Sequence, residues 1–171
     1  MNNRVIYRAA KGAVEAGLAA LRFNFRGVGA STGRYDKGAG EQKDVAALID
    51  WLEQRYPGLP LALVGFSFGA WVGLQVGVHD PRIAALIGLG PPLNSYDFDF
   101  LLDDAQASLL VVGTRDDFCP RDKMEIFARR LPKTSAVRWI DGAGHFFTHQ
   151  IDQIQFLVRD YLRAQFKGTQ T

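Results

Sequence analysis

An uncharged run of 18 residues, from Leu61 to Val78, constrains the fold of this chain more than any other feature. Its length and apolar character would allow a membrane-spanning helix. However, Gly65, Ser67 and Gly69 interrupt its middle, and a proline precedes it. We therefore interpret the run as a short buried strand, a tight turn and the start of a helix, and we expect no membrane span.

Strand and helix periodicities alternate along the rest of the chain. Apolar residues at helical spacing predict helices over Val5–Ala16, Val45–Leu52, Phe68–His79, Met124–Leu131 and Ile151–Leu162. Alternating or continuously apolar runs predict strands at Leu18–Phe25, Leu61–Phe66, Ile83–Leu89 and Leu109–Val112, with an edge strand at Val137–Trp139. The segment Gly90–Ala107 is irregular and is the only candidate for a small cap over the site.

This alternation predicts the fold class. Strands that are apolar on both faces belong inside a sheet that is covered by helices. Alternating strands and helices imply a mostly parallel sheet with right-handed crossovers. We therefore expect one α/β domain over residues 1–171, built as three layers with helices on both faces of the sheet. Ligands bind such sheets at the carboxyl ends of the strands.

Composition excludes several classes of function. Lys and Arg number 20 and Asp and Glu 18, so the net charge is +2 and nucleic-acid binding through a basic face is disfavoured. The only cysteine, Cys119, excludes an intrachain disulfide and a CxxC metal site, and it fits a reducing compartment such as the cytoplasm. Residues Met1–Lys11 lack the apolar segment of a signal peptide.

The strongest chemical signal is the pentapeptide Gly65-Phe66-Ser67-Phe68-Gly69, a G-x-S-x-G pattern between a predicted strand and a predicted helix. This context is the one that a nucleophile elbow requires, because a sharp turn there lifts the serine hydroxyl above the sheet. The Phe68 N–H would then lie where it can donate to an oxyanion. The alternative is an ordinary strand-to-helix turn with a capping serine.

A nucleophilic serine needs a base, and the base needs an acid that orients it. Asp116 follows a predicted buried strand in the sequence Gly113-Thr114-Arg115-Asp116, which makes it the preferred acid. The adjacent Asp117 is its main competitor. The alternative role for Asp116 is a loop carboxylate that caps the helix starting near Arg121.

His145 is the preferred base, because it lies in a glycine-rich loop between the last predicted strand and the last predicted helix. His79 is expected at the far end of its helix, away from the active edge. His149 follows His145 by four residues, so a zinc pair is conceivable, but there is no HExxH glutamate and no evident third ligand. We therefore expect no metal and no other cofactor.

The order Ser67, Asp116, His145 resembles that of the α/β-hydrolases. Two further segments are similar to that family: Phe23–Ser31 resembles its R-G-x-G-x-S loop, and Gly40–Asp44 resembles the start of the helix after that loop. The resemblance covers nearly the whole chain and is closest to small bacterial dienelactone-hydrolase-like and lidless esterases. Dienelactone hydrolases proper use a cysteine nucleophile, so a serine favours hydrolysis of oxygen esters.

The resemblance also reveals a difference at the N-terminus. Members of the family carry strands before the first helix, and the loop after the last of these supplies a second oxyanion donor. We expect these strands to be missing here, because Met1 falls at or just before the first predicted helix. In the family, the last of them lies between the strands that correspond to Leu18–Phe25 and Leu61–Phe66, so its absence would leave a gap in the middle of the sheet. Since unpaired strand edges are costly, we expect neighbouring strands to close the gap, another chain to supply the strand, or the natural protein to begin upstream. We favour the last.

One remaining site candidate is Arg26, which could bind a substrate carboxylate or tie its own loop together. Six aromatic residues could line an acyl pocket or belong to the core: Phe66, Phe68, Trp71, Phe118, Phe146 and Phe147. Of these, we expect only Phe68 and Phe146 near the site. The leading hypothesis is a serine hydrolase of small acyl esters, whose partner is a small-molecule ester. A homo-oligomer is compatible with the sequence, whereas nucleic-acid and membrane partners are not expected. A thioesterase, an acyltransferase or a peptidase would use the same three residues, and a non-catalytic binding scaffold is the alternative from another class.

Overall fold

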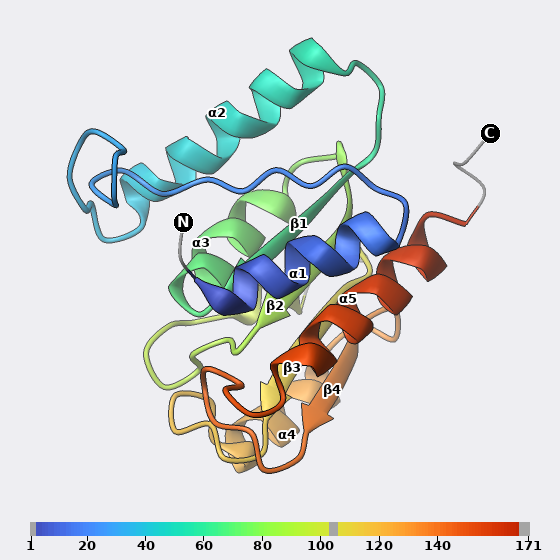
Figure 1. Ribbon diagram of the computed structural model, residues 1–171. Coiled ribbons are helices and arrows are strands. Elements are labelled where there is room, and N and C mark those ends of the chain that lie inside the picture. Colours follow the sequence, from blue (N-terminus) through green and yellow to red (C-terminus); the bar gives the residue numbers. More distant parts are fainter. Residues whose placement is uncertain (1–2, 103–105, 168–171) are drawn as a thin grey trace.

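A computed structural model describes residues 3–102 and 106–167 of the chain (Figure 1). The helices are α1 (Arg4–Glu15), α2 (Ala39–Arg55), α3 (Phe68–Gly77), α4 (Arg121–Arg130) and α5 (Ile151–Gln165), with a short 3₁₀ helix, η1 (Asp99–Leu101). The strands are β1 (Leu61–Phe66), β2 (Ile83–Leu89), β3 (Ser108–Gly113) and β4 (Ala136–Ile140).

The four strands form one parallel sheet in the order β1-β2-β3-β4. The register aligns their carboxyl ends: Phe66 pairs with Leu89, Leu89 with Val111, and Gly113 with Ile140. β2 and β3, the two central strands, are almost entirely buried, as their continuous apolar sequences predict. The α/β fold class expected from the sequence is confirmed.

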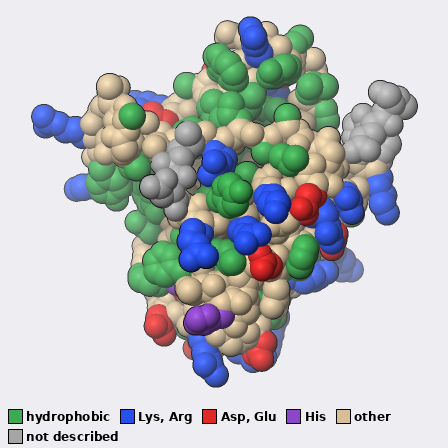
Figure 2. Space-filling model, viewed as in Figure 1, with side chains coloured by type: hydrophobic (Ala, Val, Ile, Leu, Met, Phe, Trp, Pro, Cys, Tyr) green, Lys and Arg blue, Asp and Glu red, His purple; other side chains and the backbone are tan. Residues whose placement is uncertain are grey.

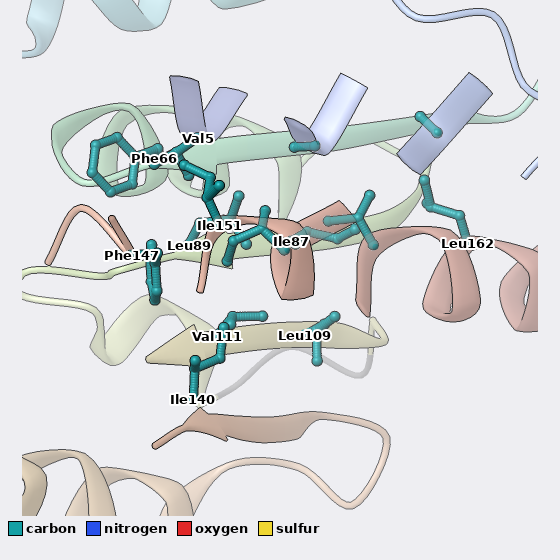
Figure 3. Close-up of a cluster of buried hydrophobic side chains, with 14 of the residues drawn as sticks. Val5, Phe66, Ile87, Leu89, Leu109, Val111, Ile140, Phe147, Ile151 and Leu162 are labelled. Carbon is teal, nitrogen blue, oxygen red and sulfur yellow. The ribbon is translucent and has the colours of Figure 1, made fainter. Parts of the chain in front are cut away.

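Helices cover both faces of the sheet, which gives three layers. On one face, α1 and α5 pack on the sheet and on each other, and their apolar side chains form one core cluster with the strands (Figure 3). Gly12 of α1 lies so close to the α5 backbone that a Cβ there would meet the carbonyl of Gln155. The other face carries α3 and α4, and α2 packs against α3.

The predicted strand at Leu18–Phe25 is wrong. This segment runs as an extended chain from the end of α1 to the loop before α2, but it belongs to no sheet (Figure 1). Its side chains alternate as in a strand, yet Leu21 and Phe23 are exposed. β1 is the edge strand of the sheet, so neighbouring strands do not close the expected gap. The segment stays unpaired because no described strand lies beside it to accept its backbone hydrogen bonds.

Lys and Arg side chains are interspersed with acidic and apolar ones over the face that α1 and α5 form (Figure 2). Among residues 3–102 and 106–167, no helix has both the length and the apolar character that crossing a bilayer would require. The segment Gly90–Ala107 contains η1 and otherwise no regular structure in its described part; residues 103–105 of it lie outside the described residues.

Candidate active site

The candidate site lies at the carboxyl edge of the sheet. Ser67 follows β1 directly, Asp116 follows β3 by three residues, and His145 lies in the loop after β4. Because the strands are parallel and in register, the three loops emerge side by side. Ser67 and His145, which are 78 positions apart in the sequence, can therefore be in direct contact.

The turn at Ser67 has the strained geometry of an elbow. Ser67 has a φ of 53° and a ψ of −123°, which few residues other than glycine adopt. Its N–H donates to the carbonyl of Leu89 at 2.9 Å, and its own carbonyl accepts from Ala70 at the start of α3. Gly65 makes the turn sterically feasible, since a Cβ there would meet the Gly69 carbonyl. Strand and helix backbones can then cross closely enough to raise the serine hydroxyl at the helix N-terminus.

Ser67, His145 and Asp116 form a continuous hydrogen-bonded chain. The Oγ of Ser67 lies 2.8 Å from Nε2 of His145. On the other side of the ring, Nδ1 lies 3.0 Å from Oδ2 and 3.1 Å from Oδ1 of Asp116. Because an ionised carboxylate only accepts, these contacts fit the imidazole tautomer with its proton on Nδ1, in which Nε2 can accept from the serine hydroxyl.

Backbone groups fix the Asp116 carboxylate from behind. The N–H of Phe118 donates to Oδ1 at 2.9 Å, and the N–H of Cys119 donates to the same oxygen at 3.3 Å. The Asp116 side chain is fully enclosed, with 0% of it exposed. Asp117, by contrast, is exposed, and its carbonyl accepts from the side chain of Asn94. The carboxylate that meets the imidazole is therefore the one favoured by the sequence.

The loops after β3 and β4 are joined directly, which aligns the acid with the base. The N–H of Thr114 donates to the carbonyl of Ile140 and that of Arg115 to the carbonyl of Ala143. The Thr114 hydroxyl accepts from the N–H of Gly142 at 2.8 Å. Because these bonds cross between the two loops, Asp116 and His145 are held at a fixed separation.

Aromatic rings enclose the imidazole of His145. The ring of Phe66 has its centroid 5.1 Å away, that of Phe118 4.6 Å and that of Phe146 5.2 Å. Gly90 leaves room for the imidazole, because a Cβ there would lie 3.3 Å from the ring. Its φ of 53° is a second reason for a glycine at this position. These groups limit the orientations that the imidazole can adopt.

The Phe68 N–H is the candidate oxyanion donor. It is the first amide of α3, and no acceptor for it is found in the described part of the chain. Unpaired amides at a helix N-terminus favour negative charge. The Phe68 side chain is half-buried and packs against Phe25, Tyr35, Trp71 and Tyr96.

Arg26 is bound to Asp44 and supports its own loop. Its Nη2 donates to Oδ1 of Asp44 at 2.7 Å, its Nε donates to the same carboxylate, and its backbone N–H donates to Oδ2 at 3.0 Å. The bond to Arg26 holds the pKa of Asp44 below its usual range. The buried Glu41 secures the other end of the loop by accepting from the N–H groups of Asp36 and Gly38.

The side chains of the remaining nucleophilic and metal-binding candidates take no part in the hydrogen bonds that join Ser67, His145 and Asp116. Burial, and then the nearby Asp116 carboxylate, raise the pKa of the Cys119 thiol to about 12, so the thiol stays protonated. His79 and His149 are both exposed. Within residues 3–102 and 106–167 there is no cluster of three His, Cys, Asp or Glu side chains that could hold a metal ion.

The chain is similar to known proteins over most of its length. The model of the family described as "Serine aminopeptidase, S33" matches residues 4–99, which include α1, the elbow and β2. The uncharacterized protein RP471 of Rickettsia prowazekii is 37% identical over 171 residues, with 95% of this chain and 72% of that protein aligned.

Two solved structures extend the match to the whole fold. The α/β serine hydrolase homologue of Coxiella burnetii is 36% identical with a TM-score of 0.87, covering 95% of this chain and 77% of that one. XC6422 of Xanthomonas campestris, described as an α/β serine hydrolase without a lid, is 30% identical with a TM-score of 0.87, covering 96% and 74%.

The chain belongs to the serine aminopeptidase S33 family of α/β hydrolases. The α/β-hydrolase resemblance inferred from the sequence is thereby confirmed. As a member of this family, the chain has its nucleophile-elbow segment inside the matched region, whereas Asp116 and His145 lie beyond residue 99. Their assignment therefore rests on the geometry described above.

The structure brings together Ser67, Asp116, His145, Phe68 and Phe146, and it directs Arg26 toward Asp44 instead of the serine. Sequence reasoning missed Gly90, Tyr35 and Tyr96, and it considered Phe118 only as one of several aromatic residues that could line an acyl pocket. A glycine directly after a buried strand is a signal that could have identified Gly90. No local pattern marks the two tyrosines, because their positions depend on how separate loops pack.

Proposed function

We propose that this S33-family hydrolase cleaves small carboxylic esters through a covalent acyl-enzyme, with Ser67 as nucleophile, His145 as base and Asp116 as the acid that orients the imidazole. The single observation that carries this proposal is the 2.8 Å contact of the Ser67 hydroxyl with Nε2 of His145, whose Nδ1 contacts a buried carboxylate. This arrangement has the roles that acyl transfer requires.

In the first half of the proposed reaction, Ser67 Oγ attacks the ester carbonyl while its proton moves to Nε2 of His145. The carbonyl oxygen becomes negative and accepts from the Phe68 N–H. Collapse of this intermediate breaks the bond to the leaving alcohol, which takes the proton from Nε2. In the second half, a water molecule attacks the acyl-enzyme by the same route, and the acid is released with Ser67 restored.

Asp116 acts through the imidazole. Its carboxylate accepts from Nδ1–H, which selects the tautomer that leaves Nε2 unprotonated, and it stabilises the imidazolium that forms in each half-reaction. Burial of this carboxylate among backbone N–H donors keeps it in one orientation. Water is the only co-substrate that these steps need, so we propose no metal or organic cofactor.

Thioesters and amides are the competing substrates, since the family description names an aminopeptidase and the same acyl-enzyme serves all three. The test compares the oxygen ester, the thioester and the amide of one acyl group, with the wild-type protein and Ser67→Ala. We expect the ester to be cleaved fastest and Ser67→Ala to lose about 10³-fold or more in rate. Equal hydrolysis by Ser67→Ala would overturn the proposal.

A further inference from the structure

Two separate aromatic surfaces flank Ser67, and different loops supply them. The first, which we call the tyrosine wall, consists of Tyr35, Phe68 and Tyr96. The second, which we call the histidine wall, consists of Phe118 and Phe146. Both surfaces adjoin the serine, because Phe68 follows it in the chain and His145, which contacts both rings of the histidine wall, is hydrogen-bonded to it.

The tyrosine wall is assembled around Phe68. Its ring lies 5.7 Å from that of Tyr35 and 5.9 Å from that of Tyr96. Tyr96 is held in place from behind, because it stacks on Trp71 at 4.4 Å with the rings nearly parallel, and the Trp71 indole N–H donates to the carbonyl of Asp97.

The two tyrosines also approach each other. Burial, and then the Tyr35 hydroxyl through repulsion and a side-chain hydrogen bond, raise the pKa of Tyr96. Tyr35 comes from the loop before α2 and Tyr96 from the segment after β2, so the wall joins two loops that are 61 residues apart. The exposed fraction of Tyr35 is 63%, which leaves its ring available to a bound molecule.

The histidine wall is equally open to a ligand. Phe118 and Phe146 are 49% and 62% exposed, although both rings contact His145. Core packing does not explain these two exposed rings, because neither Phe118 nor Phe146 belongs to the two clusters of buried hydrophobic side chains.

Acyl-transfer chemistry distinguishes the two walls. The proton taken from Ser67 must be handed to the leaving oxygen by the same Nε2 atom, so the leaving group lies next to the imidazole. The acyl carbon is bonded to Ser67 Oγ and its oxygen points to the Phe68 N–H. The acyl chain is the remaining substituent of that carbon, so it extends away from the imidazole. The tyrosine wall is the aromatic surface beside the serine whose ring contacts are with Phe68 and not with His145.

We propose that the tyrosine wall binds the acyl group of the substrate and that the histidine wall binds the leaving alcohol. This inference rests on the proposed function, and it names the substrate class: neutral esters with an apolar acyl group. The ion pair of Arg26 favours neutral substrates, because its guanidinium is already bound to Asp44 and is not free to bind a carboxylate on the acyl chain.

Two ester series separate the walls experimentally. The acyl series joins acetyl, butyryl and hexanoyl groups to p-nitrophenol, and the alcohol series joins acetyl to ethanol, butanol and benzyl alcohol. The variants are Tyr35→Ala, Tyr96→Ala and Phe118→Ala. Phe156→Ala is the matched control, because Phe156 is also an exposed aromatic residue, at 48%, but lies on α5. Tyr35→Ala and Phe118→Ala truncate exposed rings, so we expect both variants to fold.

We expect Tyr35→Ala and Tyr96→Ala to lower the ratio of kcat/KM for hexanoyl over acetyl esters by about tenfold, since each removes apolar contact with the acyl chain. Their benzyl-to-ethyl ratio should stay within about twofold, and Phe118→Ala should give the reverse pattern. Equal changes in both series, or in neither, would overturn the inference while leaving Ser67-dependent hydrolysis intact. Loss of Ser67 dependence itself would overturn the proposed function as well.

Discussion

The carboxylate of Asp116 contacts Nδ1 of His145 with both oxygens, at 3.0 and 3.1 Å, and Asp117 next to it is exposed. Two adjacent aspartates therefore have different surroundings, and they form a matched pair for mutation. We expect Asp116→Asn to lower kcat by about 10⁴-fold, because an amide can donate to Nδ1 and stabilise the wrong tautomer. Asp117→Asn should retain activity within about threefold of the wild type. Steady-state ester hydrolysis measures both, and the reverse ranking would contradict the assignment.

The two glycines of the pentapeptide should differ sharply in their tolerance of alanine. A Cβ at Gly65 would meet the backbone of Gly69 and Ala70, whereas a Cβ at Gly69 would meet only the Phe25 ring at 3.6 Å. We expect Gly65→Ala to reduce the free energy of unfolding by about 3 kcal/mol or more, and Gly69→Ala to change it by less than about 1 kcal/mol. Urea unfolding of the two variants tests this. Equal stabilities would show that the elbow is less tightly packed than described.

The bond between Asp44 and Arg26 should make stability depend on pH. This bond lowers the pKa of Asp44 in the folded state, so its stabilising effect is present above the ordinary carboxyl pKa and is lost as the pH falls below about 4. Asp44→Asn should therefore be less stable than the wild type at pH 7, and the difference should shrink at pH 3. Urea unfolding at both pH values measures it.

Asp50→Asn is the control for this prediction. Asp50 lies on the same helix as Asp44 and forms an ion pair with Arg82, but the Asp50 side chain is 60% exposed. Exposed ion pairs contribute little, so this variant should unfold nearly as the wild type does at both pH values. If Asp44→Asn lowered the free energy of unfolding by the same amount at pH 7 and pH 3, lost packing and not the charge would account for the effect.

Tyr161 offers a substitution that should not destabilise the protein. Its hydroxyl is buried without a hydrogen-bond partner among the described residues, and burial raises its pKa to about 12. Because an unsatisfied buried hydroxyl is costly, Tyr161→Phe should leave the free energy of unfolding unchanged or raise it by up to about 1 kcal/mol. Thermal unfolding beside Tyr7→Phe, an exposed control, checks this. A loss above about 1 kcal/mol would reveal an unrecognised partner of the hydroxyl.

Periodicity predicted most of the fold because burial repeats with the geometry of each element. The continuously apolar runs at Leu61–Phe66 and Ile83–Leu89 are strands with those bounds, since both strands are enclosed by helices on two faces. Four of the predicted helices have bounds within three residues of the observed ones, whereas α2 begins at Ala39, six residues before the predicted start at Val45.

The failure at Leu18–Phe25 has a physical cause. Alternation records which side chains point the same way, but a strand also needs a neighbouring backbone to bond to. No described strand supplies that neighbour, so the same alternating sequence remains an extended, exposed segment.

The candidate site also contains some residues that the sequence could predict and others that it could not. Ser67, Asp116 and His145 could be predicted because parallel strands end at one edge, and residues that follow them must meet there. Tyr35 and Tyr96 could not, because each lies in a loop whose path depends on contacts with other loops.

In the proposed mechanism, His145 activates Ser67. The most direct measurement is the reaction of the purified protein with a fluorophosphonate, followed by mass spectrometry of the labelled peptide, because this reagent requires an activated serine. The account predicts one label on Ser67, with the reaction slowed about 10³-fold or more in His145→Ala and absent in Ser67→Ala. Labelling at another residue, or labelling of Ser67 at an undiminished rate in His145→Ala, would contradict it.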